Sequence, residues 1–340
     1  MDRRYYNLDL VKILAAILIV FHHYQQLSGA VFKGVNFFNG TFNYGYLVEL
    51  FFIISGFLMV HGDKRNKSGI NEFVRKCIRI YPSVICACVV YVFIWYIYNM
   101  FCNEYLLGER FGVIQVIASL LLFHQGWAIE IVPAVNNPTW YLCVLILCYI
   151  VYYCINYFAF EKRMFGFVLI VIISTVSFKL GISLPFFRLL TQRGYSSFFV
   201  GCLIYILLQT ISYNKIKIIS IGLLVSSGIF GYFFKFSNWY NMVFLFFPGV
   251  VLFATNIKQI YNKKIVLLSG ASFEVYLWHV PMYGLYMFGV DLLNISISHT
   301  YLTMLLFGLL VECFAIVFFK YFETPVVQKL NKLYITRYNR

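Results

Sequence analysis

The first apolar segment of the chain carries two polar side chains whose spacing could support catalysis. Lys12 and His23 lie in the segment LDLVKILAAILIVFHHY, with ten residues between them. In an α-helix, eleven steps of about 100° bring His23 to within roughly 20° of Lys12, about 16 Å further along the axis. Histidine is the commonest general base in proteins. The pair is therefore a candidate catalytic site, although a lysine that reaches the membrane interface and a packing histidine would give the same pattern.

Glu49 is an acidic residue in the otherwise apolar segment YLVELFFIISGFLMV. A charge in such a segment is costly and predicts a nearby partner. We expect Glu49 to lie at the depth that His23 reaches, where a carboxylate would orient the imidazole and stabilise its protonated form. A structural ion pair is the alternative. The small residues Ser55 and Gly56 in the same segment predict close packing against another helix.

A basic cluster follows in the segment FVRKCIRIYPS, which contains Arg75, Lys76, Arg79 and Tyr81. Several cationic donors within about a turn and a half are suited to phosphate groups. A cluster that anchors the chain to lipid headgroups is the alternative.

Three later segments also combine polar and aromatic residues. Trp140 lies in NNPTWYL, His279 in SFEVYLWHVP, and Glu323 in YFETP. His279 is a candidate for a second histidine in a cavity, or for a packing residue. For Glu323, a simple ion pair with Lys320 is the alternative to a role at the site.

The elements that must position these residues follow from the composition. Of 340 residues, 61% are hydrophobic and only 12% are charged, which is too few to cover a soluble domain of this size. The chain is long enough for about ten spans of roughly 20 residues. We therefore expect an all-α polytopic membrane protein, a single domain over residues 1–340 with no fused soluble domain. The expected spans are 8–29, 42–62, 81–101, 139–159, 166–184, 195–212, 216–234, 240–256, 266–290 and 298–321.

The distribution of basic residues predicts the orientation. Most of them gather in alternate connecting segments, which is typical of cytoplasmic loops, and both termini are therefore expected in the cytoplasm. These residues are Arg3, Arg4, Lys64, Arg65, Lys67, Arg75, Lys76, Arg79, Lys162, Arg163, Lys215, Lys217, Lys258, Lys263, Lys264, Lys329, Lys332, Arg337 and Arg340. Because the net charge of +14 is explained in this way, nucleic acid is not an expected partner.

One apolar stretch, 113–127, is of doubtful spanning length. If it spanned, the charge asymmetry of every later loop would invert, so we interpret it as a re-entrant or interfacial helix on the outer side. His124, Trp127 and the segment 136–138 would then lie near the outer mouth of the protein.

Taken in order along the chain, these segments resemble acyltransferase family 3, the integral-membrane acyltransferases that modify cell-envelope glycans. The resemblance covers residues 8–325. Its motifs are Leu8-Asp9 followed by Lys12 and His23, Glu49 followed by Leu50-Phe51-Phe52 and Ser55-Gly56-Phe57, the cluster Arg75, Lys76 and Arg79-Ile80-Tyr81-Pro82, the segment Trp140 to Leu142, the set Ser272, Tyr276, Leu277 and His279, and the pair Glu323 and Pro325.

The chain departs from the family pattern in three places. Lys12 stands where arginine is more frequent, and Glu49 stands where aspartate is more frequent. Many members carry a glutamate a few residues after the tryptophan, where this chain has Val144 and Leu145. The role of that glutamate cannot be transferred to this chain.

The resemblance implies an O-acyltransferase that moves an acyl group, most simply acetyl, from cytoplasmic acyl-CoA to a sugar hydroxyl. The acceptor would be an envelope or capsular polysaccharide or its lipid-linked precursor. The implied catalytic residues are His23 as base and Glu49 as its partner. The residues implied in binding donor or substrate are Lys12, Arg75, Lys76, Arg79, Tyr81, Trp140 and His279.

The same resemblance implies no bound cofactor and no metal, since acyl-CoA is consumed as a substrate. A multi-pass protein of the bacterial plasma membrane is expected, in contact with lipid and served by separate glycan-assembly proteins. A secondary transporter or flippase that uses Lys12, His23 and Glu49 as a relay is the alternative from another class. It would not account for the ordered motifs.

Overall fold

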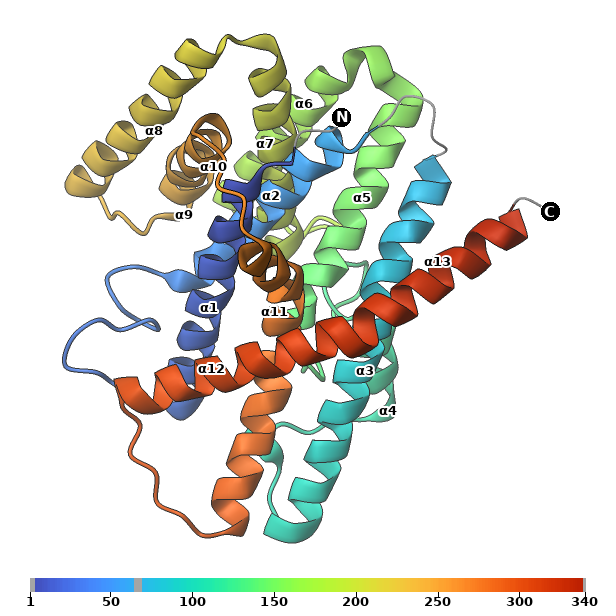
Figure 1. The fold of residues 1–340 in the computed structure, drawn as a ribbon, viewed down its shortest axis with the longest axis vertical. Coiled ribbons are helices and arrows are strands. Elements are labelled where there is room, and N and C mark those ends of the chain that lie inside the picture. The colour runs from blue at the N-terminus through green and yellow to red at the C-terminus, as the bar shows by residue number, and fades with distance from the viewer. Residues whose placement is uncertain (1–3, 64–68, 339–340) are drawn as a thin grey trace.

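The computed structural model describes residues 4–63 and 69–338, and these residues form an all-α bundle without a β-strand (Figure 1). The first half contains α1 (Tyr6–Ser28), α2 (Leu47–His61), α3 (Gly69–Cys102), α4 (Val113–Leu120), α5 (Trp140–Ala159), α6 (Arg163–Leu180) and α7 (Leu189–Thr210). The second half contains α8 (Tyr213–Phe233), α9 (Trp239–Asn241), α10 (Phe247–Asn256), α11 (Lys263–Leu292), α12 (Tyr301–Phe318) and α13 (Thr324–Tyr338). Two π-helical segments, Met242–Phe246 and Phe319–Glu323, join α9 to α10 and α12 to α13.

Each of the ten expected spans coincides with a helix or with the α9–α10 unit. Eight segments of the described chain are long and apolar enough to cross a membrane. One of the eight, Asn137–Leu180, contains both α5 and α6, whereas α7 is not among them. The prediction of an all-α polytopic membrane protein is confirmed.

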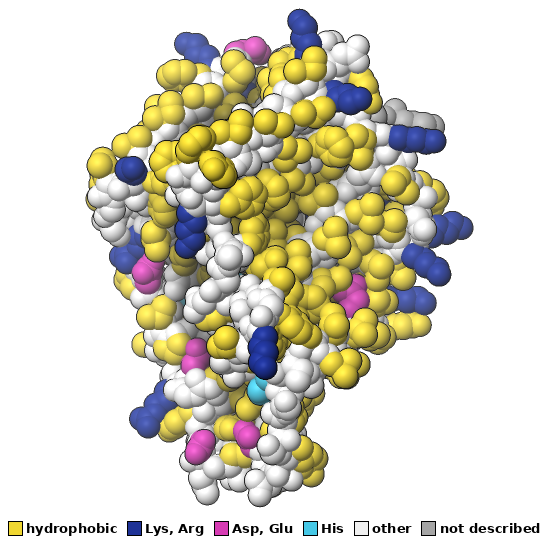
Figure 2. Space-filling view, turned by 90° about the vertical axis from the view of Figure 1, so that its left-hand side faces the viewer, with side chains coloured by type: hydrophobic (Ala, Val, Ile, Leu, Met, Phe, Trp, Pro, Cys, Tyr) yellow, Lys and Arg dark blue, Asp and Glu magenta, His cyan; other side chains and the backbone are white. Residues whose placement is uncertain are grey.

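The surface of the bundle carries many exposed hydrophobic side chains. Figure 2 shows one face on which hydrophobic side chains predominate, while Lys and Arg are mostly scattered toward its margins. Large side chains such as Ile218, Leu309 and Tyr232 are more than half exposed. In a membrane protein such side chains face lipid instead of water.

The basic connections lie at one end of the molecule. In Figure 1 the labelled N-terminal end and the connections after α5 and α7 lie toward the upper end, whereas the connection between α11 and α12 lies at the lower end. This arrangement agrees with the charge pattern, and the cytoplasmic location of the upper end stays a prediction. Arg3, Lys64, Arg65, Lys67 and Arg340 lie outside the described residues.

The stretch 113–127 does not span. Its helix, α4, has eight residues and is about 12 Å long, far less than the hydrocarbon thickness of about 30 Å. The hydroxyl of Tyr81, on α3, donates to the carbonyl of Leu121 at 3.0 Å, so the end of α4 is held against α3.

The position of His124 relative to the outer mouth stays a prediction. Its side chain is fully buried. The ring lies against Cys143, with Nδ1 at 3.3 Å from Sγ, and Nε2 is 3.4 Å from the hydroxyl of Thr139. His124 therefore fastens the loop after α4 to the beginning of α5. Trp127 bonds to the carbonyl of Leu122 within the same loop.

Helices α2 and α7 pack with almost no space between their backbones. Gly56 of α2 lies directly against the carbonyl of Phe198, and Gly201 of α7 lies against the carbonyl of Ile53. A Cβ at either glycine would overlap the facing backbone. The close packing predicted from Gly56 is confirmed, while the hydroxyl of Ser55 contacts that of Tyr141 at 3.1 Å.

Candidate active site

Helices α1 and α11 lie side by side and in parallel, and they connect the two ends of the candidate site. Ser269, near the start of α11, donates a hydrogen bond of 2.7 Å to Asp9 near the start of α1. Further along both helices, the rings of His23 and His279 stack with their centroids 4.9 Å apart and their planes inclined by 22°. The spacing of Lys12 and His23 on one uninterrupted helix is therefore preserved.

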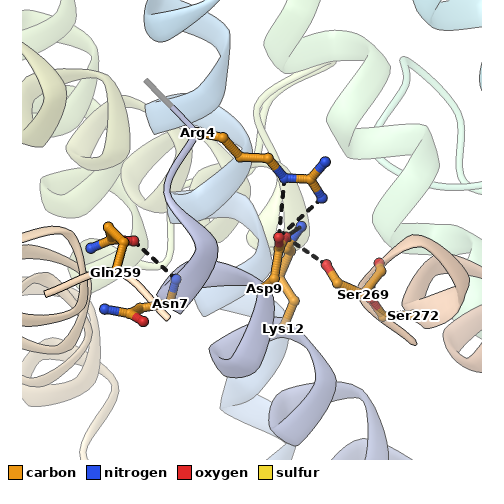
Figure 3. A network of polar contacts seen from close by, with 7 residues as sticks. All are labelled: Arg4, Asn7, Asp9, Lys12, Gln259, Ser269 and Ser272. Carbon is orange, nitrogen blue, oxygen red and sulfur yellow. Dashed lines mark hydrogen bonds and ion pairs between the residues drawn. The ribbon is translucent and has the colours of Figure 1, made fainter. Parts of the chain in front are cut away.

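At the first end, Asp9 is the centre of a polar network (Figure 3). The Lys12 ammonium is 2.7 Å from one carboxylate oxygen of Asp9, and the Arg4 guanidinium is 3.0 Å from the other. Lys12 is thus fixed by a carboxylate and a neighbouring helix, and its side chain retains 23% of its exposure. Sequence reasoning identified Asp9 only as part of a motif and did not predict this pairing.

At the second end, His23 is half-buried and lines a cavity. Its Nδ1 lies 2.9 Å from the side-chain oxygen of Gln26. Because a carboxamide oxygen can only accept, this contact places the ring proton on Nδ1 and leaves the lone pair on Nε2. A neutral imidazole in this tautomer can act as a general base.

The cavity has a volume of about 580 Å³, within the usual range for small-molecule sites. Most of its polar lining comes from α1, the loop 38–45, α5, α7 and the loop before α9. The polar and aromatic lining residues include His22, His23, Gln26, Asn137, Trp140, Arg193 and Lys235. His22, the residue before His23, also lines this cavity, and its Nδ1 lies 2.8 Å from the carbonyl oxygen of Phe37.

Glu49 is fully buried, as expected for an acid with a partner, but that partner is Arg193. One oxygen of Glu49 accepts from Nε of Arg193 at 2.6 Å and from the indole nitrogen of Trp239 at 3.0 Å. The expected contact with the imidazole of His23 does not occur in the structure, because Gln26 makes the side-chain hydrogen bond to that ring. Glu49 instead holds Arg193 at the cavity wall.

Arg193 is the cation that this arrangement presents to the cavity. Its guanidinium lies 5.7 Å from the ring centroid of Tyr46 and 5.6 Å from that of Trp140. A fixed guanidinium that lines the same cavity as a histidine base can stabilise an oxyanion in a transition state. Trp140, implied above in substrate or donor binding, lines the cavity at which His23 lies.

His279 supports His23 from behind. Its side chain is 1% exposed, it is absent from the cavity lining, and its ring nitrogens have no side-chain partner among the described residues. The ring of Tyr276 lies 5.9 Å from it. The geometry therefore favours a positioning role over direct contact with a substrate.

The basic cluster on α3 does not converge on one pocket. Arg75 is exposed and pairs with Glu72 at 3.5 Å, whereas Lys76 lies over the ring of Tyr149 and lines a separate cavity of about 270 Å³. Arg79 is close enough to Lys12 to interact with it electrostatically. Tyr81, as described above, bonds to the α4 segment.

The alternative interpretation of Glu323, an ion pair with Lys320, is not found among the described residues. Lys320 lies over the ring of Tyr321, 5.0 Å from its centroid. Glu323 is 4% exposed and lies close to Glu274, whose carboxyl group accepts from the indole nitrogen of Trp278 at 3.0 Å.

Sequence reasoning missed Arg193, Gln26 and Trp239. The sequence did contain an indication for Arg193. It lies close to the start of an expected span, and Glu49 required a cationic partner. Gln26 lies three residues after His23, which places the two on neighbouring positions of one helix face. Trp239 had no such signal.

An all-α membrane bundle with a histidine and an arginine at a polar cavity defines a membrane protein equipped for acid–base chemistry. Comparison with protein families identifies the family within this class. Residues 5–319 match the model of the acyltransferase domain, acyltransferase family 3, and the chain therefore belongs to this family of membrane acyltransferases.

One curated relative is an O-acetyl transferase of Shigella phage Sf6. It is 26% identical over 149 residues, which cover 42% of this chain and 43% of the relative. The aligned part thus spans less than half the length of that relative. No solved structure matches the chain.

Proposed function

We propose that the protein is an O-acetyltransferase that moves an acetyl group from cytoplasmic acyl-CoA to a sugar hydroxyl at the cavity lined by His23. The acceptor would be an envelope or capsular polysaccharide or its lipid-linked precursor. The observation that carries the proposal is the contact of Nδ1 of His23 with the side-chain oxygen of Gln26, which leaves Nε2 to act as base in a cavity that Arg193 also lines. The name of the phage relative supports acetyl as the acyl group.

The reaction follows from general acid–base chemistry. Nε2 of His23 takes the proton of the sugar hydroxyl as its oxygen attacks the thioester carbonyl. Arg193 stabilises the oxyanion of the tetrahedral intermediate. When the C–S bond breaks, the imidazolium returns the proton to the departing thiolate, so that the products are the O-acetyl sugar and free CoA. The histidine is thereby regenerated.

The donor would enter from the opposite end of α1. Lys12 and Arg79 supply cations there for phosphate groups, and His23 lies about 16 Å further along the helix from Lys12. A donor that spans this distance needs an anionic head and a long thin arm that ends in the reactive carbonyl. Acyl-CoA has this construction.

The proposed setting is the bacterial plasma membrane, with both termini in the cytoplasm and the cavity at the outer end. Acetyl groups would then cross the membrane within the protein while CoA stays in the cytoplasm. Lipid would surround the apolar faces. Separate glycan-assembly proteins would supply the acceptor.

The proposal is tested with the purified protein in proteoliposomes, with radiolabelled acetyl-CoA supplied on one side and a glycan acceptor on the other. The expected result is acetylated glycan outside and an equal amount of free CoA inside. Movement of glycan without consumption of the thioester would contradict the proposal and favour a transporter.

A further inference from the structure

The cavity at His23 has a marked imbalance of charge. Among its lining residues are the cations Arg193 and Lys235, but no aspartate or glutamate. The charge of Arg193 is compensated by Glu49, which lies buried behind it. The charge of Lys235 is not compensated, because its side chain is exposed and makes no ion pair or hydrogen bond within the described chain.

The loop that carries Lys235 is held firmly at the cavity. The hydroxyl of Ser237 accepts from the backbone N–H of Asn43, which lies in the opposite loop of the cavity wall, at 2.6 Å. The rings of Phe42 and Phe236 lie 6.2 Å apart across the same junction. Immediately after this loop, Trp239 is bonded to Glu49. The backbone that follows Lys235 is therefore anchored at the cavity that His23 lines.

We propose that the acceptor is an anionic glycan whose carboxylate or phosphate group is bound by Lys235. The inference rests on the proposed function for its assignment of this cavity to the acceptor. Lysine binds such groups as a point charge, and an unpaired cation without a nearby acid favours an anionic ligand over its neutral counterpart. Lys235 is thus a specificity residue, separate from the catalytic His23.

The test compares acidic and neutral sugars of equal shape. Methyl glucuronoside and its uncharged amide form one pair, and glucose 1-phosphate and methyl glucoside form a second pair that distinguishes phosphate from carboxylate. Binding to the reconstituted protein is measured by saturation-transfer NMR, and acetyl transfer is measured separately with labelled acetyl-CoA. We expect the acidic member of at least one pair to bind about fivefold more tightly, the size of one solvent-accessible ion pair.

Three variants test whether Lys235 is responsible for the preference for the acidic sugar. Lys235→Gln should abolish it, and Lys235→Arg should retain it. Lys33→Gln should leave it unchanged, because Lys33 is an exposed lysine of the loop after α1 that does not line the cavity.

Equal binding of acid and neutral sugar in both pairs would overturn the inference, as would absence of binding or a preference that survives Lys235→Gln. A preference that depends on Lys235, with no acetyl transfer to any acceptor, would support the anionic site and contradict the proposed function. The two proposals can therefore fail separately.

Discussion

The imidazole rings of His23 and His279 stack 4.9 Å apart, one at the cavity and the other fully enclosed behind it. The stack joins α1 to α11 at the level of the proposed chemistry. A ring packed in this way restricts the rotamers of its neighbour, and a base must be held in a narrow range of positions to react. His279 would thus orient His23 without touching the substrate.

Removal of this stacking partner should slow the chemical step. We expect His279→Ala to lower kcat by roughly tenfold to a hundredfold with little change in the KM for acetyl-CoA. His279→Phe keeps an aromatic ring and should restore most of the rate. Steady-state kinetics of the reconstituted variants would check this. If the phenylalanine variant were as slow as the alanine variant, the imidazole of His279 would have a chemical role of its own.

The ion pair of Glu49 and Arg193 should behave as a unit. Their side chains are 1% and 19% exposed, and loss of one partner leaves a buried charge uncompensated at a cost of about 3 kcal/mol. Glu49→Gln and Arg193→Gln should each lower the thermal stability and the transfer rate. The double variant should lose much less than the sum of the two. Additive losses in thermal unfolding would show that the two residues act independently.

Arg79 and Arg75 offer a matched comparison on one face of α3. Arg79 interacts electrostatically with Lys12, while Arg75 pairs with Glu72. Arg79→Gln should raise the KM for acetyl-CoA by about tenfold, and Arg75→Gln by less than about threefold. Neither should alter the KM for the acceptor. Equal effects of both substitutions would favour a diffuse basic anchor.

His124 should make the protein sensitive to acid. Burial lowers its pKa to about 4, so the folded protein binds its proton less readily than the unfolded chain does. Its contribution to stability is therefore present at neutral pH and is lost as the pH falls through the unfolded value of about 6.5, by about 2 kcal/mol between pH 7 and pH 5. In thermal unfolding, His124→Gln should show a smaller fall over this range. An unchanged pH dependence would exclude His124 as its source.

Much of the fold could be predicted from the sequence because apolar runs of spanning length are a strong signal. The ten expected spans all fall on helices, and α4 is too short to span, as the charge pattern required. The polar site was predicted less completely. Helical periodicity placed Lys12 and His23 on one face, but it carries no information about contacts between helices.

The errors lie where tertiary packing decides the partner. Glu49 required a cation, yet only the approach of α7 along Gly56 and Gly201 determines that the cation is Arg193. Local spacing offered Lys320 as a partner for Glu323, but Glu323 ends the π-helical segment Phe319–Glu323 and is buried close to Glu274. Such pairings join residues more than forty positions apart, and no local pattern predicts them.

The most direct test of the proposed mechanism is acetyl transfer by His23→Gln, which removes the base and keeps a polar side chain. His299→Gln is the matched control, because His299 bonds to Tyr24 and does not line the cavity. With labelled acetyl-CoA and a glycan acceptor, His23→Gln should lose about a hundredfold to ten-thousandfold of kcat and the control should retain normal activity. Transfer at the wild-type rate by His23→Gln would contradict the assignment of His23 as the catalytic base.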